Sequence, residues 1–164
     1  ADLPECGTFV FSTTPLRTLS DPGVAQPVVE VAGPVSPFVL LPVDLPTPTT
    51  GIAAWVRGFT DLSDAVAAHR GSPLVAAGDF NAVREHAPMR RLLEETGLRD
   101  AAEAAGYGWT PTFPSERWHP PLLSLDHVLI SADLGASAVR TQEIEGQEHR
   151  ALLVVIDLPD GHSP

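Results

Sequence analysis

The segment Ser72–Leu93, SPLVAAGDFNAVREHAPMRRLL, combines an apolar run with two polar residues and the start of a helix. Its run Leu74–Ala77 predicts a buried strand. Asp79 and Asn81 follow two residues apart, so their side chains point to one side while Phe80 points to the other. A carboxylate that accepts a proton from water, beside an amide that donates to an anionic oxygen, suits hydrolysis of a phosphate ester. An Asx turn that closes the strand is the other interpretation.

Apolar runs and helical spacing on both sides of this segment predict alternating strands and helices. One helix is expected from about Gly51 to Arg70, with an apolar face made by Ile52, Trp55, Phe59, Leu62 and Val66. A second is expected between Pro88 and Gly97. Further strands are predicted at Gly7–Phe11, Pro27–Val31, Pro37–Val43, Leu125–Ile130 and Ala151–Leu158. Several strands are apolar enough to be covered on both faces, which indicates a layered α/β fold.

Composition narrows the class of protein. The chain has 164 residues, 43% of them apolar, a net charge of −11 and no lysine. An acidic surface repels polyanions, so the sequence has no strong signature of binding long duplex DNA. The longest apolar runs, Phe38–Val43 and Ala151–Ile156, are far shorter than the roughly 20 residues that span a bilayer. The single cysteine, Cys6, excludes an internal disulfide framework.

Two other predicted strands also carry acidic or imidazole side chains at one end. Asp126 stands at the start of an apolar strand, and Glu148 and His149 come directly before the last one. Side chains at strand ends of one sheet converge on one crevice. These residues therefore favour the hydrolytic interpretation of Asp79. His127 follows Asp126 and points the other way, so we interpret it as a packing residue in the core or behind the site.

Four motifs in this order, GDFNA, WTPTFP, LDHVLIS and EHRALLVVIDL, resemble the carboxyl-terminal part of the endonuclease/exonuclease/phosphatase superfamily. The resemblance covers roughly Phe9–Leu158 and is most specific from Leu74 onward. It implies part of a deoxyribonuclease-like four-layer sandwich, in which a two-layer β-sandwich core is flanked by helices. It also implies a metal-dependent phosphoesterase that uses Mg²⁺, with Mn²⁺ as the other candidate ion.

The resemblance implies a role for each candidate site residue. Asp79 resembles the acid that orients or deprotonates the attacking water, and Asn81 the donor that binds the scissile phosphate. Asp126 resembles the acid that holds the catalytic imidazole, and His149 that imidazole, which stabilises charge on the phosphate. A carboxylate beside a histidine also selects its tautomer. Glu148 stands where the family usually has a metal-contacting Asp, so we expect it to contact the metal.

The chain departs from the family pattern in three places. It has Gln147-Glu148-His149 instead of Ser-Asp-His, and Asp44 stands near the position of a phosphate-contacting His or Tyr. A carboxylate there repels a phosphate unless a metal lies between them. The family's amino-terminal strands, with an Asn and the principal metal-binding Glu, have no counterpart upstream of Phe9. We do not take Glu5 as a substitute.

These departures support an alternative function. The chain is then a non-catalytic or truncated member that serves as a binding or structural module. In either case we expect residues 1–164 to form a single, incomplete domain. A segment upstream of Ala1 could carry the missing strands, a leader or a membrane attachment, so the sequence leaves the compartment open.

The substrate class is only broadly constrained. A phosphodiester, a phosphomonoester or a lipid head group is favoured over bulk DNA, and the oligomeric state is not determined. Trp109, Phe113 and Trp118 either line a substrate cleft or pack under a Pro-rich loop, and packing is the preferred interpretation.

Overall fold

The computed structural model describes residues 8–19, 27–115 and 118–159. The strands are β1 (Leu16–Thr18), β2 (Val29–Val31), β3 (Phe38–Asp44), β4 (Leu74–Asp79), β5 (Arg99–Asp100), β6 (Asp126–Ile130), β7 (Gly135–Gln142) and β8 (Ala151–Asp157). The helices are α1 (Pro48–Ala68), α2 (Ala87–Thr96) and α3 (Ala101–Ala104). Glu5 and Cys6 lie outside the described residues.

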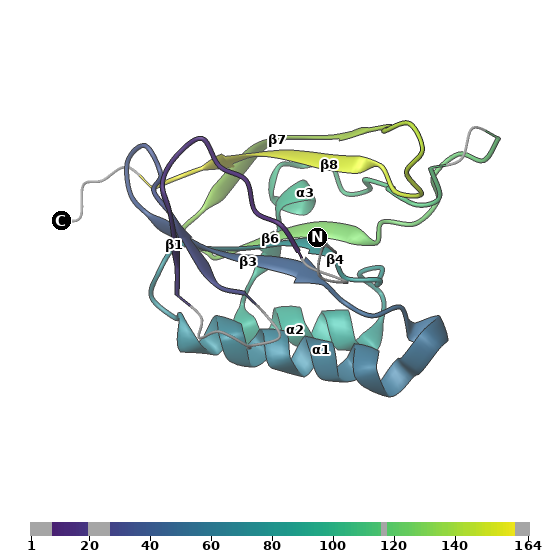
Figure 1. Cartoon of the computed structure of the whole chain (residues 1–164), viewed down its shortest axis with the longest axis horizontal. Coiled ribbons are helices and arrows are strands. Elements are labelled where there is room, and N and C mark those ends of the chain that lie inside the picture. The colour runs from purple at the N-terminus through teal and green to yellow at the C-terminus, as the bar shows by residue number, and fades with distance from the viewer. Residues whose placement is uncertain (1–7, 20–26, 116–117, 160–164) are drawn as a thin grey trace, which may run out of the picture.

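The elements form layers around one central sheet (Figure 1). This six-stranded sheet has the order β1-β2-β3-β4-β6-β5. Helices α1 and α2 cover one face, and the antiparallel pair β7-β8 lies over the other, with α3 close to β7. The predicted α/β fold with two facing sheets is confirmed, and the second sheet is much the smaller.

Register in the central sheet aligns three carboxylates. Strand β3 runs parallel to β4 with Asp44 opposite Asp79, and β6 runs antiparallel to β4 with Asp126 opposite Asp79. Paired positions on neighbouring strands lie about 5 Å apart. Asp44, Asp79 and Asp126 therefore form one row across the end of the sheet.

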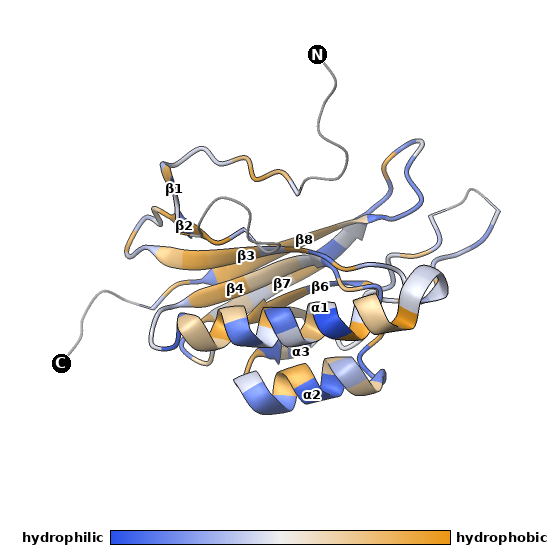
Figure 2. Ribbon diagram, turned by 60° about the horizontal axis from the view of Figure 1, so that its bottom comes forward, coloured by the Kyte–Doolittle hydropathy of each residue, from blue (hydrophilic) through white to orange (hydrophobic). Residues whose placement is uncertain are grey.

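Helix α1 packs on the sheet through four buried side chains, Trp55, Phe59, Leu62 and Val66. Their spacing of three or four residues places them on one face, as predicted. The helix is interrupted at Gly51, and Ile52, expected on the same face, is instead 66% exposed. Figure 2 shows mostly hydrophobic central strands and mixed helices, as expected for helices that cover one face.

Two glycines meet specific backbone requirements. Gly97 ends α2 with φ of 73°, a left-handed conformation that glycine adopts without steric cost. Gly78 has φ of 143°, and a side-chain carbon there would overlap the carbonyl oxygen of Val43 on β3. Gly78 thus allows β3 and β4 to approach closely just before Asp79.

The other face of the central sheet packs against the small sheet. Val75, Val128 and Ile130 are buried there, with Leu152, Val154 and Ile156 of β8 packed against this cluster. Alternate residues of β8 therefore face the sheet, whereas Val155 is 55% exposed. Burial of each large aliphatic side chain contributes about 1.5–3 kcal/mol.

Some predicted elements differ from the structure. The described residues 8–11 form no strand, so the prediction at Gly7–Phe11 is wrong, and β1 lies at Leu16–Thr18 instead. β1 is exposed along its length and pairs with β2, supported by a 2.9 Å contact between Arg17 and Glu30. β5, α3 and β7 were not predicted from the sequence. Among the described residues, no helix is both long and apolar enough to cross a membrane.

Candidate active site

The predicted site residues gather at the end of the sheet that carries the aspartate row. Asp79 ends β4, Asp126 begins β6, and His149 lies in the turn before β8. Each of these three offers a ligand atom within 4.8 Å of those of the other two. Strand pairing brings Asp79 and Asp126 together, and the small sheet, which packs on the central one, brings His149 to them.

Asp126 and His149 form a hydrogen-bonded pair. The Nδ1 of His149 lies 2.8 Å from the Oδ2 of Asp126, and their side chains are 28% and 18% exposed. A carboxylate only accepts, so Nδ1 carries the hydrogen. Among the described residues, the Nε2 of His149 has no hydrogen-bond partner. That nitrogen is therefore available to a ligand. The ring of Phe113 lies 5.0 Å from the His149 ring and limits its orientation.

Thr112 holds the two members of this pair together. It is fully buried, and its carbonyl oxygen accepts a 2.8 Å hydrogen bond from the backbone N–H of Arg150. Its Oγ1 accepts from the backbone N–H groups of Leu125 and Asp126, both at 3.3 Å. One residue therefore positions both the start of β6 and the residue after His149. This role of Thr112 was not predicted from the sequence, although the residue lies within the motif WTPTFP.

Asp79 and Asn81 form an Asx turn and also belong to the site. The backbone N–H of Asn81 donates to Oδ1 of Asp79 at 2.8 Å, and Asn81 has φ of 48°. Its side-chain amide donates to Oδ2 of Asp79 at 3.1 Å and to the carbonyl of Leu45 at 2.8 Å. The two interpretations of GDFN are thus compatible, since the turn itself orients the carboxylate.

The surroundings of Asp79 make its carboxyl group more basic than usual. Burial is the main reason that its pKa is raised, and the nearby charges of Asp126 and Asp44 act in the same direction. The N–H of Asn81 and the positive charge of His149 oppose the shift. A carboxylate with a raised pKa accepts a proton from water more readily.

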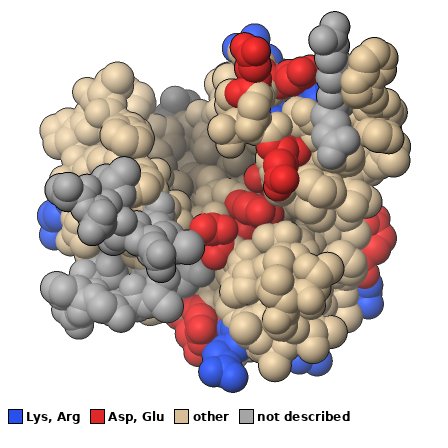
Figure 3. Space-filling model, turned by 45° about the vertical axis from the view of Figure 1, so that its right-hand side comes forward, with Lys and Arg blue, Asp and Glu red and all other residues tan. Residues whose placement is uncertain are grey.

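The donor set fits a divalent cation. Two carboxylates are the oxygen ligands that Mg²⁺ and Mn²⁺ prefer, and an imidazole extends the fit to Mn²⁺. Figure 3 shows acidic side chains in a band across this end of the molecule, beside a hollow. A cation offsets the repulsion among the aligned carboxylates.

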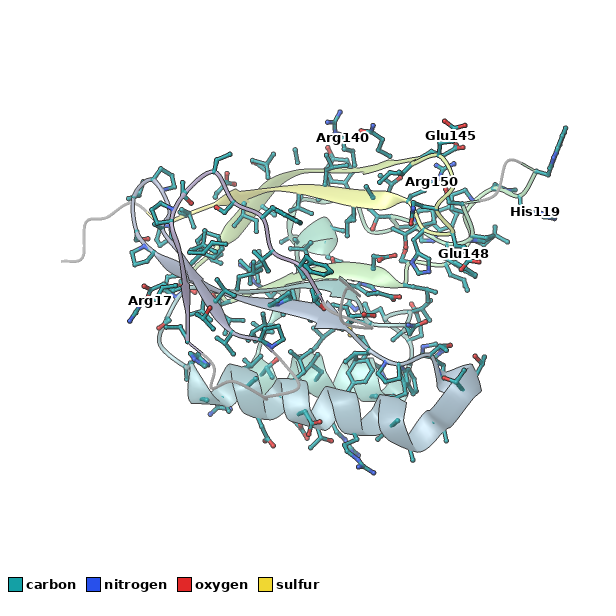
Figure 4. The ribbon with its side chains drawn as sticks, in the orientation of Figure 1. Arg17, His119, Arg140, Glu145, Glu148 and Arg150 are labelled. Atoms are coloured by element: carbon teal, nitrogen blue, oxygen red, sulfur yellow. The ribbon has the colours of Figure 1, made fainter. Side chains whose placement is uncertain are left out.

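Glu148, the predicted metal residue, is not part of this three-residue group. It is exposed in the turn before β8, and its carbonyl oxygen accepts a 2.7 Å hydrogen bond from the N–H of Ser115 (Figure 4). Its role as a metal contact stays a prediction.

The aromatic residues of the long loop do not behave alike. Trp109 is 63% exposed and Trp118 is 83% exposed, so the interpretation of packing is wrong for both. Phe113 is half-buried against His149 and packs at the site itself.

His127 is buried as predicted, at 4% exposure, on the opposite face of β6 from Asp126. Its Nδ1 lies 2.8 Å from Oδ2 of Asp100, and its Nε2 lies 2.8 Å from the carbonyl oxygen of Ala82. Burial lowers the pKa of His127, but the hydrogen bond and charge of Asp100 and the carbonyl of Ala82 outweigh it, and the pKa is raised. Both ring nitrogens face acceptors, the carboxylate of Asp100 and the carbonyl of Ala82, and this arrangement favours the protonated ring.

Several solved structures share this fold. A functionally unknown conserved protein from Enterococcus faecalis is 17% identical with a TM-score of 0.63, covering 87% of this chain and 64% of its own. A mannosyl-6-phosphatase from Bacteroides thetaiotaomicron is 15% identical with a TM-score of 0.62, at 80% and 55% coverage. D. rerio TDP2, in complex with a single-strand DNA product, is 12% identical with a TM-score of 0.64, at 87% and 67% coverage.

The first two of these structures show that the chain spans about 55% to 64% of the length of such proteins. A comparison with curated protein sequences finds no match. The profile of the Endonuclease/Exonuclease/phosphatase family matches residues 4–149, which is most of the chain. The family includes phosphatases and nucleases, in agreement with the strand-end carboxylates and imidazole described above. The chain belongs to the endonuclease/exonuclease/phosphatase family.

Proposed function

We propose that this protein is a metal-dependent phosphoesterase whose site lies at the aspartate row. The observation that carries the proposal is the Asp126–His149 hydrogen bond of 2.8 Å beside Asp79, with all three ligand atoms within 4.8 Å. An oriented imidazole, a basic carboxylate and a cluster of cation ligands are the groups that hydrolysis of a phosphate ester requires.

The side chains divide the work according to their contacts. Asp79, with its raised pKa, orients the attacking water and accepts its proton. Asp126 holds His149 so that Nε2 faces the phosphate oxygens and donates to the charge that develops there. The side-chain amide of Asn81 binds the phosphate. Its N–H that donates to Asp79 at 3.1 Å, the longer of its two side-chain hydrogen bonds, turns to donate to a phosphate oxygen instead.

The metal belongs to the same proposal. Asp79 and Asp126 would hold it through carboxylate oxygens, with Glu148 as a further residue that reaches it. When bound, Mg²⁺ or Mn²⁺ supplies Lewis-acid stabilisation of charge on phosphate oxygens. The position of Asp44 opposite Asp79 in the sheet adds negative charge that favours a cation over an uncovered phosphate.

The substrate we favour is a small phosphodiester, a phosphomonoester or a lipid head group. The net charge of −11 and the acidic side chains across the site end disfavour a long polyanion. Structures of similar fold belong to proteins described as a mannosyl-6-phosphatase and as TDP2 bound to a single-strand DNA product. A short nucleic acid end therefore stays within the proposed substrate class.

The test measures Mg²⁺-dependent hydrolysis of bis-p-nitrophenyl phosphate by the complete protein. His149→Ala and Asp79→Ala should each lower the rate by about 100-fold or more. His69→Ala and Asp133→Ala are the matched controls: His69 follows α1, Asp133 follows β6, and both lie at the opposite end of the sheet. Both controls should keep the wild-type rate. Equal rates in all five proteins would refute the catalytic assignment.

One observation favours the second candidate, a non-catalytic module that keeps the fold. Glu148, which replaces the family's usual aspartate, is exposed and lies outside the group of converging ligand atoms. If this candidate is correct, no Mg²⁺-dependent hydrolysis is detected and calorimetry finds phosphate-ester binding that His149→Ala weakens.

A further inference from the structure

The segment 79–82, which carries two site residues, is held by hydrogen bonds to other parts of the chain at residues 80, 81 and 82. The N–H of Phe80 donates to the carbonyl of Leu125 at 3.0 Å, and the carbonyl of Phe80 accepts from Nε1 of Trp55 at 3.1 Å. The Asn81 side chain donates to Leu45. The carbonyl of Ala82 accepts from Nε2 of His127 at 2.8 Å. The last hydrogen bond is made by a buried side chain whose other ring nitrogen lies 2.8 Å from the carboxylate of Asp100.

The alternation of β6 explains how His127 reaches this position. Asp126 and His127 are neighbours, so Asp126 projects to the site and His127 to the helix-covered face. There the His127 ring lies edge-on to the ring of Phe80, 5.6 Å away, with its Nε2 at Ala82. Strand β6 therefore supplies Asp126 to the site and, through His127, a support for the segment that carries Asp79 and Asn81.

Asp100 fixes the orientation of the His127 ring. Its Oδ1 accepts a 2.8 Å hydrogen bond from the N–H of Ala102 in the first turn of α3, and its Oδ2 lies 2.8 Å from Nδ1 of His127. The side chain of Asp100 is 10% exposed. Both partners are packed, so the ring has one orientation and Nε2 points at Ala82.

We propose that His127, oriented by Asp100, is a positioning residue that holds the segment 79–82 so that Asp79 and Asn81 keep their places in the site. The effect on hydrolysis rests on the proposed function, whereas the effect on the segment does not. The support is specific because the buried carbonyl of Ala82 needs a donor, and His127 is the side chain that supplies it.

Two substitutions at His127 separate positioning from packing. In His127→Gln the amide nitrogen replaces Nε2 and still donates to Ala82, while the side chain no longer donates to Asp100. In His127→Asn the amide nitrogen replaces Nδ1 and keeps Asp100, while the donor to Ala82 is removed. Each variant keeps one of the two buried hydrogen bonds of the ring and removes the other, so each serves as the control for the other.

The readout that needs no activity is hydrogen exchange at the backbone N–H of Asn81, which donates to Asp79 within the turn. We expect exchange in His127→Asn to be about 10-fold to 100-fold faster, as for loss of a supporting contact. In His127→Gln it should stay within about threefold of wild type. Equal exchange rates in the two variants would overturn the proposal.

The kinetic readout uses the same variants with bis-p-nitrophenyl phosphate and Mg²⁺. His127→Asn should lower kcat by about 10-fold to 100-fold with little change in KM, and His127→Gln should restore most of it. If both variants lose kcat equally, and in proportion to their loss of melting temperature, His127 is a structural residue and not a positioning residue. If the wild type itself hydrolyses nothing, the proposed function fails, and the exchange measurement still decides the positioning role.

Asp100→Asn keeps the test usable if His127→Asn does not fold. The new amide oxygen can still accept from Ala102, and the amide nitrogen can donate to Nδ1 of a neutral ring, which leaves Nε2–H directed at Ala82. Exchange at Asn81 should then remain within about threefold of wild type. If exchange at Asn81 in Asp100→Asn is about 10-fold faster or more, the hydrogen bond from Nε2 of His127 to Ala82 does not by itself hold the segment 79–82, and the proposal is overturned.

Discussion

Strand β6 contributes one residue to each of two acid–imidazole pairs on its opposite faces, and the surroundings of the two pairs give them different properties. Asp126–His149 and Asp100–His127 have the same Nδ1 to Oδ2 distance of 2.8 Å. The first pair is 18% and 28% exposed, and the second is 10% and 4% exposed. The same chemical pair is therefore open to a ligand on one face and enclosed in the core on the other.

The two pairs also differ in the hydrogen-bond partner of the Nε2 of the histidine. In His149 it has no partner among the described residues, whereas in His127 it donates to the carbonyl of Ala82. A histidine with one nitrogen available can serve a substrate, and one with both nitrogens engaged can only hold its neighbours. Proximity of an acid to a histidine is thus insufficient to identify a catalytic pair.

The largest expected effect is a difference in the free energy of unfolding that each pair loses when its histidine is replaced. His127→Ala leaves the carboxylate of Asp100 buried without its charged partner, so the free energy of unfolding should fall by about 3–5 kcal/mol. His149→Ala exposes Asp126 to solvent and should change it by less than about 1 kcal/mol. Urea unfolding at neutral pH measures both values. Similar losses in the two variants would contradict the contrast between an enclosed and an open pair.

The next effect tests what maintains the open pair. Thr112→Val removes the acceptor for the N–H groups of Leu125 and Asp126 while keeping the shape of the side chain. We expect a loss of about 1–3 kcal/mol in unfolding free energy, and a fall of about 10-fold in kcat because the start of β6, which carries Asp126, loses its side-chain support. Thr112→Ser keeps the hydroxyl and should restore kcat. If kcat of Thr112→Ser is no higher than kcat of Thr112→Val, the hydroxyl of Thr112 does not support the site.

The smallest effect concerns the charge beside the open pair. The pKa of Asp79 is raised in the folded protein, so its ionisation opposes folding. Its contribution to stability is therefore greatest below the ordinary aspartate pKa of about 3.9 and declines as pH rises through the raised value. The melting temperature of Asp79→Asn minus that of wild type should increase with pH across this window without divalent metal. A difference that decreases with pH would show that Asp79 is stabilised as an anion.

Local patterns in the sequence were sufficient for much of the framework. The apolar run before Asp79 predicted β4, the spacing of Trp55, Phe59 and Leu62 predicted most of α1, and Gly97 predicted the end of α2. These features succeed because burial of one face imposes a period that the chain must follow. Strand ends with Asp or His were visible in the same way.

Strand β7 shows why some elements could not be predicted from the sequence. Its sequence, Gly135–Gln142, is small and polar, only Val139 is buried, and its register shifts between Ala136 and Ala138. The strand forms because β8 pairs with it along its length, and no local periodicity reports that pairing. β1 is a second case, since it is exposed throughout and depends on β2.

The sequence alone determined which chemical groups stand at the ends of strands, because alternation and apolar runs are local properties. The tertiary structure decided which of those groups meet. Strand register aligned Asp44, Asp79 and Asp126, and long-range contacts paired His149 with Asp126 and His127 with Asp100. The physical reason is that a histidine acquires its role from the acceptors around both ring nitrogens, and folding brings those acceptors from distant parts of the chain.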